Sequence, residues 1–167
     1  ERKIICATTF CCRSCRLELY VSKYFAGESK AKMLKLIDNL RKALATRIAN
    51  LTWMNDTTKI NALVKLNSFT VKVGYPDKWR DYSKLTIDPA KSLYDNVAAA
   101  TYVETLRNLE KFGKPVDKSE WGMTPQTVNA YYNPTTNEIC FPAAILQAPF
   151  FDVNADDATN YGAIGVV

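Results

Sequence analysis

The sequence of 167 residues contains no histidine. Catalysis by a serine or cysteine nucleophile normally needs a neighbouring general base, most often histidine, and that base is missing here. Only six glycines occur, and none of the glycine-rich phosphate-binding motifs is present, so nucleotide binding has no motif to support it. No segment approaches the ~18–20 apolar residues of a membrane-spanning helix. Taken alone, the residues provide no complete active site.

The composition is that of a folded globular chain. Hydrophobic residues make up 47% of the sequence and charged residues 23%, both ordinary values for a protein with a core. The net charge is +5, but the basic residues are mixed with acidic ones and do not cluster with aromatic residues. Solvated helix faces explain this pattern, so we predict that the chain does not bind nucleic acid.

Four of the five cysteines lie near the N-terminus, at Cys6, Cys11, Cys12 and Cys15. Cys12 and Cys15 have the C-x-x-C spacing of redox and zinc sites, but a zinc site needs a second ligand pair and a redox motif needs a thioredoxin-like strand and helix. The stretch is basic, Arg13 and Arg16 interrupt it too early for a signal peptide, and it does not begin with Met. We interpret residues 1–15 as unrelated to the rest, and the chain as part of a longer protein. A cysteine-based redox or metal protein is kept as an alternative.

Helical periodicity covers much of the remaining sequence. Apolar residues recur every three or four positions over residues 28–50, with Lys and Arg on the opposite face, which predicts a helix. A second helix is predicted from Asn55 or Asp56, either of which can cap it, to Gly74. A third is predicted over residues 91–112, and a last helix begins near residues 154–157.

Two strands are predicted near the end of the chain, over Thr127–Tyr132 and Glu138–Phe141. Residues 133–137 are rich in Asn, Pro and Thr and form the turn between them. Cys140 alternates with apolar neighbours, which is typical of a small core residue. An isolated two-stranded hairpin is marginally stable, so we expect further structure to pack against it. The predicted fold class is α+β, mostly helical, with this β-hairpin.

The hairpin also suggests a function. A strand with a free edge can pair with an extended peptide through backbone hydrogen bonds. Asn129 could add a side-chain amide, which both donates and accepts, or it could cap the hairpin internally. Spacing alone favours the internal cap. A non-catalytic peptide-binding module that uses the hairpin edge is therefore one hypothesis.

Blocks of residues along positions 17–167 follow one another in a distinctive order. They are Leu19-Tyr20-Val21, Lys23-Tyr24-Phe25, Trp53-Met54, Thr58-Lys59, Lys65-Leu66, Gly74-Tyr75-Pro76-Asp77, Val116-Asp117-Lys118, Glu120-Trp121, Val128-Asn129-Ala130-Tyr131-Tyr132-Asn133-Pro134, Asn137-Glu138-Ile139, Phe141-Pro142-Ala143, Ile145-Leu146-Gln147 and Pro149-Phe150-Phe151. In this order they resemble the neprilysin/endothelin-converting-enzyme family of zinc metallopeptidases.

The resemblance implies a zinc-dependent endopeptidase with a zincin-like fold. Asn160-Tyr161-Gly162 and Ile164-Gly165 match family residues that lead into the active-site helix with its HExxH motif. In that motif two histidines bind zinc and the glutamate activates the attacking water. The motif would follow Val167, so we expect no metal ligand and no catalytic residue in these 167 residues. Zinc is expected in the full-length parent but not bound to this fragment, which is predicted to be inactive alone.

Four substrate-binding residues follow from the same resemblance. Asn129 and Ala130 match residues that hold the substrate backbone beside the scissile bond. Tyr131 matches a position next to the non-primed side of the cleft. Val167 matches a residue that lines the apolar pocket on the primed side. The expected partners are peptide substrates.

The resemblance also implies a division of the chain. Residues 1–15 match no part of the family pattern, which a frameshift or a misassembled gene end would explain. Residues 16–124 correspond to the end of the helical domain that caps the cleft, and residues 125–167 to the start of the catalytic domain. The family resemblance favours an extracytoplasmic location, either secreted, periplasmic or membrane-anchored.

Overall fold

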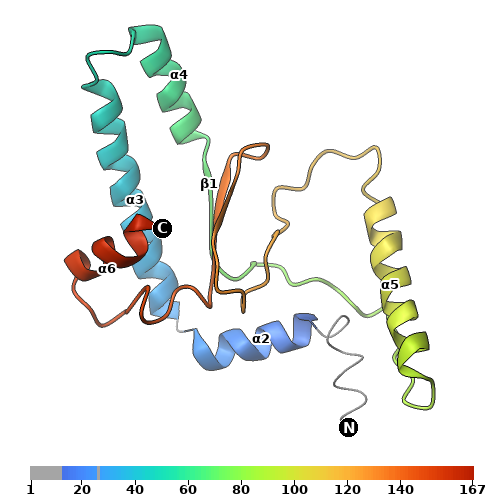
Figure 1. Ribbon diagram of the computed structural model, residues 1–167. Coiled ribbons are helices and arrows are strands. Elements are labelled where there is room, and N and C mark those ends of the chain that lie inside the picture. The colour runs from blue at the N-terminus through green and yellow to red at the C-terminus, as the bar shows by residue number, and fades with distance from the viewer. Residues whose placement is uncertain (1–12, 26) are drawn as a thin grey trace. The chain divides into compact units, whose positions relative to one another are not determined.

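The computed structural model describes residues 13–25 and 27–167, with side chains from Leu17 onward. Its helices are α2 (Arg13–Tyr24), α3 (Gly27–Ala49), α4 (Asp56–Asn67), α5 (Leu93–Leu109) and α6 (Asp157–Ala163), followed by the 3-10 turn η1 (Ile164–Val166). Its strands are β1 (Thr70–Gly74), β2 (Tyr131–Asn133) and β3 (Glu138–Pro142) (Figure 1). The predicted α+β, mostly helical class is confirmed. The alternative redox or metal site at Cys12 and Cys15 lies outside the described side chains.

The chain divides into two compact units. One contains residues 77–120 together with the described residues up to Tyr20, and the other contains residues 21–76 and 121–167. The first unit includes α5, and the second includes α3, α4, α6 and the whole sheet. None of the described helices combines the length and the apolar character that crossing a bilayer requires.

The sheet has three strands in the order β1-β3-β2. β3 pairs in parallel with β1, with Lys72 opposite Cys140, and antiparallel with β2, with Tyr131 opposite Cys140. The helix predicted to reach Gly74 is therefore wrong beyond Asn67, because the β-branched residues around Val71 form β1 instead. β1 supplies the further strand that the hairpin was expected to need.

The predicted hairpin is present, but its first strand is shorter than expected. β2 begins at Tyr131, whereas Thr127–Ala130, which were predicted to be strand, lie outside regular structure. β3 runs from Glu138 to Pro142, close to the predicted range. The turn between the strands includes Asn137, whose φ of 52° is left-handed, a conformation that asparagine tolerates better than most residues.

Alternation along the strands separates an apolar face from a polar face. Val73, Ile139 and Phe141 share the face toward α3, where Met33 is 1% exposed. Lys72, Glu138 and Cys140 share the other face, since paired residues in a ladder point the same way. Cys140 is fully buried, as predicted for a core residue.

Gly74 ends β1 in a conformation that requires glycine. Its φ is 79°, and a Cβ built on it would lie 2.6 Å from Cε1 of Phe25. A side chain there would be strained by its backbone and would also displace the buried ring of Phe25. The main chain continues the ladder beyond this point, because the Ala143 N–H donates to the Gly74 carbonyl at 2.9 Å.

Two helices begin with the same arrangement of side chains. In α5 the N-cap is Ser92, and the Asn96 side chain accepts from the Asp88 N–H and donates to the Asp88 carbonyl. In α6 the N-cap is Asp156, and the Asn160 side chain makes the same two bonds with Asp152. In each case the asparagine clamps the main-chain N–H and carbonyl of the residue eight positions earlier. The clamp fixes the direction in which the chain enters the helix.

We expect Asn160→Ala to lower the free energy of unfolding by about 1–3 kcal/mol, because it leaves the Asp152 N–H and carbonyl without their partners. Urea denaturation followed by near-ultraviolet circular dichroism measures the change. Asn39→Ala is the matched control, because it removes one exposed bond to the Tyr161 hydroxyl and should change stability by no more than about 0.5 kcal/mol. Equal effects of the two substitutions would contradict the clamp.

Candidate functional site

The free edge of the sheet is formed by β2 and the residues that lead into it. β3 covers one side of β2, and no strand within the described residues pairs with its other side. Asn129 and Ala130 directly precede β2, so their main chain lies at the start of this edge. An unpaired strand edge presents N–H and carbonyl groups that an extended peptide can use.

Asn129 is exposed, and its side-chain oxygen accepts a hydrogen bond of 2.8 Å from the Ala130 N–H. Within the described residues it makes no bond to β3, so its internal contact is confined to the adjacent residue. Because this bond is exposed to solvent, it can be exchanged for a bond to a ligand without leaving either group unpaired.

Tyr131 is partly buried, and its hydroxyl group is engaged inside the protein. The hydroxyl accepts a hydrogen bond of 3.0 Å from the Gly122 N–H and donates one of 3.2 Å to Oε1 of Glu138. Burial raises the pKa of Tyr131 far above its ordinary value, so the hydroxyl stays protonated and able to donate. The Tyr131 side chain therefore forms hydrogen bonds within the protein. Its main chain begins β2.

The carboxylate that accepts from Tyr131 also forms a buried ion pair. Lys72 Nζ lies 2.7 Å from Glu138 Oε2, and the two side chains are 7% and 5% exposed. Cys140 lies on β3, opposite Lys72 of β1 and Tyr131 of β2, on the same face of the sheet. Burial raises the pKa of its thiol to about 12, although the Tyr131 hydroxyl and the Lys72 charge act in the opposite direction.

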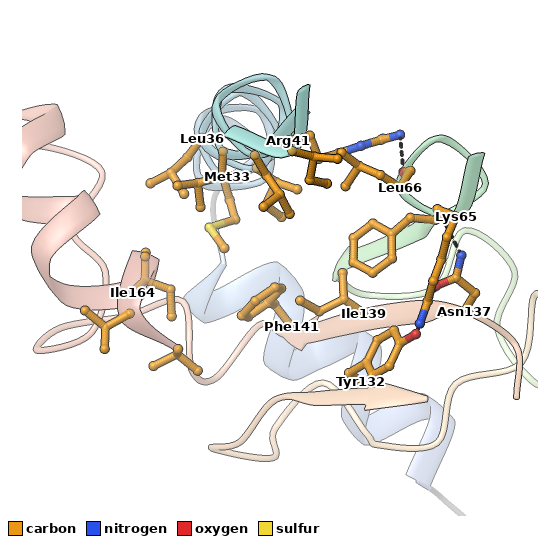
Figure 2. A pocket seen from close by; sticks show the side chains of 18 of the residues that line it. Met33, Leu36, Arg41, Lys65, Leu66, Tyr132, Asn137, Ile139, Phe141 and Ile164 are labelled. Carbon is orange, nitrogen blue, oxygen red and sulfur yellow. Dashed lines mark hydrogen bonds between the residues drawn. The ribbon is translucent and has the colours of Figure 1, made fainter. Parts of the chain in front are cut away.

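A separate apolar groove lies between the other face of the sheet and the helices of the same unit. Its volume is about 570 Å³. Figure 2 shows Met33 and Leu36 projecting from α3, Ile139 and Phe141 projecting from β3, and Ile164 approaching from the C-terminal turn. Lys65 and Asn137 close one end, where Asn137 Nδ2 donates to the Lys65 carbonyl at 2.9 Å.

Val167 lines this groove and is 55% exposed. Of the four residues predicted to bind substrate, Asn129, Ala130 and Tyr131 thus form one continuous edge, while Val167 lies in the groove. Tyr132 lines the groove as well, whereas Tyr131 points to the opposite face of the sheet. The two neighbouring tyrosines of β2 therefore point to opposite faces of the sheet, and only Tyr132 lines the groove.

Sequence reasoning missed Lys72 and Gly122 as partners of the edge. Lys72 is separated from Glu138 by 66 positions, and it lies in a segment that was predicted to be helical. The signal that could have found it was the alternation of Val71, Lys72 and Val73, which has the period of a strand. Gly122 acts through its main chain, which carries no sequence signal of its own.

The described residues hold no group of three or more His, Cys, Asp or Glu side chains arranged to bind a metal ion. The sequence has no histidine, which is the ligand that catalytic zinc sites use most. The residues that the structure describes therefore do not form a zinc site.

Two segments of the chain match family profiles. Residues 17–76 and residues 129–167 each match a profile described as peptidase family M13. The chain belongs to peptidase family M13. The second match starts at Asn129 and includes the whole hairpin, α6 and η1.

Curated relatives in the M13 family agree with this assignment. The chain is 42% identical over 156 residues to Neprilysin-3 of Drosophila melanogaster, with 89% of the chain and 20% of the relative covered. It is 42% identical over 147 residues to a neutral endopeptidase of Lactobacillus helveticus, with 87% of the chain and 23% of the relative covered. The chain thus spans about a fifth of the length of these M13 relatives.

Solved M13 structures show the same fold. A zinc metalloprotease ZMP1 of Mycobacterium tuberculosis, in complex with an inhibitor, is 56% identical with a TM-score of 0.79. The match covers 89% of this chain and 22% of that one. PEPO of Lactobacillus rhamnosis is 31% identical with a TM-score of 0.79, covering 91% of this chain and 24% of that one. The zincin-like fold expected from the resemblance is confirmed.

We expect the Cys140 thiol to be unreactive in the folded chain. In a variant with serine at the other four cysteines, Ellman's reagent at pH 8 should react slowly without urea and rapidly in urea. The thiol pKa is about 12 in the folded state, against 9.0 for an unperturbed thiol. The contribution of this thiol to stability should therefore be constant below pH 9 and should be lost as pH rises from 9 to 12, because only the unfolded thiol ionises there.

Cys140→Ala in the same background is the control, and its stability should fall less over that pH range. Rapid labelling of the folded chain, or identical pH dependence in both proteins, would contradict the buried thiol.

Proposed function

We propose that this chain forms the substrate-binding edge of an M13 zinc endopeptidase, which hydrolyses peptide bonds as part of a longer protein. The observation that carries the proposal is the free edge of β2, which begins directly after Asn129 and Ala130 and falls within the second family match. The names of the relatives, neutral endopeptidase and zinc metalloprotease among them, support the reaction class.

An extended peptide would bind by adding a strand next to β2. Its backbone would take up hydrogen bonds from the Ala130 main chain, and the Asn129 amide would both donate and accept. Asn129 Oδ1 would leave the Ala130 N–H as the peptide arrives, so one hydrogen bond replaces another. Val167 and the apolar groove would receive an apolar side chain of the peptide.

Zinc in the full-length protein would polarise the scissile carbonyl and activate water. The sequence has no histidine, and the described residues hold no group of side chains arranged to bind a metal ion, so we propose that the 167-residue chain alone has no hydrolytic activity. Its own part is to hold the peptide extended and in one position, which is the orientation component of catalysis.

We also propose the remaining assignments that rest on family resemblance. Residues 16–124 would belong to the end of the cleft-capping domain and residues 125–167 to the start of the catalytic domain. The separate family matches, at residues 17–76 and 129–167, support such a boundary. The extracytoplasmic location is supported by the family resemblance alone.

We expect Asn129→Ala to weaken peptide binding about tenfold, because the peptide backbone loses a side-chain amide partner. The measurement is isothermal titration of the whole chain with an acetylated, amidated peptide rich in Phe and Leu. Gln126→Ala is the matched control, since Gln126 is an exposed amide three residues earlier. Equal affinities of the wild type and Asn129→Ala would count against the edge as the binding site.

Mass spectrometry of the same peptide after incubation with the chain and zinc should show no cleavage. A full-length M13 peptidase run in parallel shows that the peptide is a substrate. Cleavage by the 167-residue chain that a chelator abolishes would overturn this part of the proposal.

A further inference from the structure

A continuous line of side-chain bonds crosses all three strands of the sheet. It starts at Lys72 in β1, passes through Glu138 in β3 and reaches Tyr131 in β2. From the Tyr131 hydroxyl it continues to the Gly122 main chain, in the segment that leads to the edge. We call Lys72, Glu138 and Tyr131 the cross-sheet brace.

Lys72 and Glu138 of the brace form a buried ion pair. The Lys72 and Glu138 side chains are 7% and 5% exposed, and their charged atoms lie 2.7 Å apart. The two oxygens of Glu138 are divided between its partners, with Oε2 on Lys72 and Oε1 on Tyr131. A carboxylate held by two donors in a buried place has little freedom to turn.

The free edge needs such support because β2 is short. It has three residues, so its ladder with β3 contains few hydrogen bonds. Tyr131 is its first residue and directly follows Asn129 and Ala130. Its ring also packs closely against Gly122, where a Cβ would lie 3.3 Å from Cζ of the tyrosine. The brace thus fixes both ends of the segment between Gly122 and Tyr131.

We propose that Lys72 and Glu138 are positioning residues for the peptide-binding edge, acting through the Tyr131 hydroxyl to fix the main chain of Asn129 and Ala130. This inference rests on the proposed function. It extends the peptide-binding edge to residues of β1 and β3, which are not on the edge strand. Neither side chain would touch the peptide. Their effect on binding comes from the placement of the edge before the peptide arrives.

The test compares two double variants of the whole chain. Lys72→Met with Glu138→Gln removes both charges and keeps a carbonyl oxygen that can accept from the Tyr131 hydroxyl. Lys72→Met with Glu138→Met removes the charges and the acceptor together. Replacing a buried ion pair by uncharged or apolar residues avoids leaving one charge alone, so both variants should fold.

The first readout is the NMR spectrum of the peptide-free chain. We expect the amide signals of Asn129, Ala130 and Tyr131 to stay near their wild-type positions in the Gln variant. In the Met variant they should shift and exchange faster with solvent, as should those of Tyr131→Phe. The Tyr131→Phe substitution keeps the ring and removes only the hydroxyl group. Unchanged signals in both the Met variant and Tyr131→Phe would overturn the brace.

The second readout is the titration with the Phe- and Leu-rich peptide. Affinity should fall about tenfold in the Met variant and should be close to wild type in the Gln variant. Wild-type affinity in the Met variant overturns the positioning role. If the wild type itself binds no peptide, the proposed function fails, and the NMR comparison still decides whether the brace fixes the edge.

Discussion

The pairing of β3 on both of its sides is the constraint on which the sheet unit depends. β3 has β1 as a parallel neighbour and β2 as an antiparallel one, so it joins segments more than sixty positions apart. Because side chains alternate along a strand, a shift of one residue would exchange the two faces. Phe141 would then leave the apolar groove, and Cys140 would enter it. The register therefore sets both the core and the polar face.

The polar face illustrates how a costly interaction can be useful. Removing a lysine and a glutamate from water carries a large desolvation penalty, which their attraction only partly offsets. Replacing a buried ion pair by an apolar pair of similar volume is often neutral for stability, but an apolar pair would offer no acceptor to the Tyr131 hydroxyl. The pair of Lys72 and Glu138 is better understood as a device for geometry than as a source of stability. Its link to the edge strand β2 through the Tyr131 hydroxyl agrees with that interpretation.

Much of the fold could be predicted because the signals were local. The periodicity of residues 28–50 gave α3, and the capping residues near Asn55 and Asp156 gave the starts of α4 and α6. β1 could not be predicted in the same way, because its stability comes from β3, which lies far along the chain. A run such as Thr70–Gly74 is compatible with either a helix end or a strand until its partner is known.

The candidate site also has features that local sequence signals predict and features that depend on long-range pairing. Asn129 and Ala130 could be chosen from family resemblance, and the hairpin could be found from its pattern. The placement of Val167 on the groove side, away from the Tyr131 side chain, depends on the register and on the turn after α6. The partners of Tyr131 depend on main-chain position and long-range pairing. A short stretch of sequence therefore predicts neither the placement of Val167 nor the partners of Tyr131.

The asparagine clamps at the starts of α5 and α6 have a consequence for the order of folding. Every bond in each clamp joins residues no more than eight positions apart, so closing these loops costs little entropy. Such contacts form quickly, whereas the pairing of β1 with β3 must wait for distant segments to meet. We therefore expect the two helix starts to form before the sheet, so that the strands pair when these local structures are already in place.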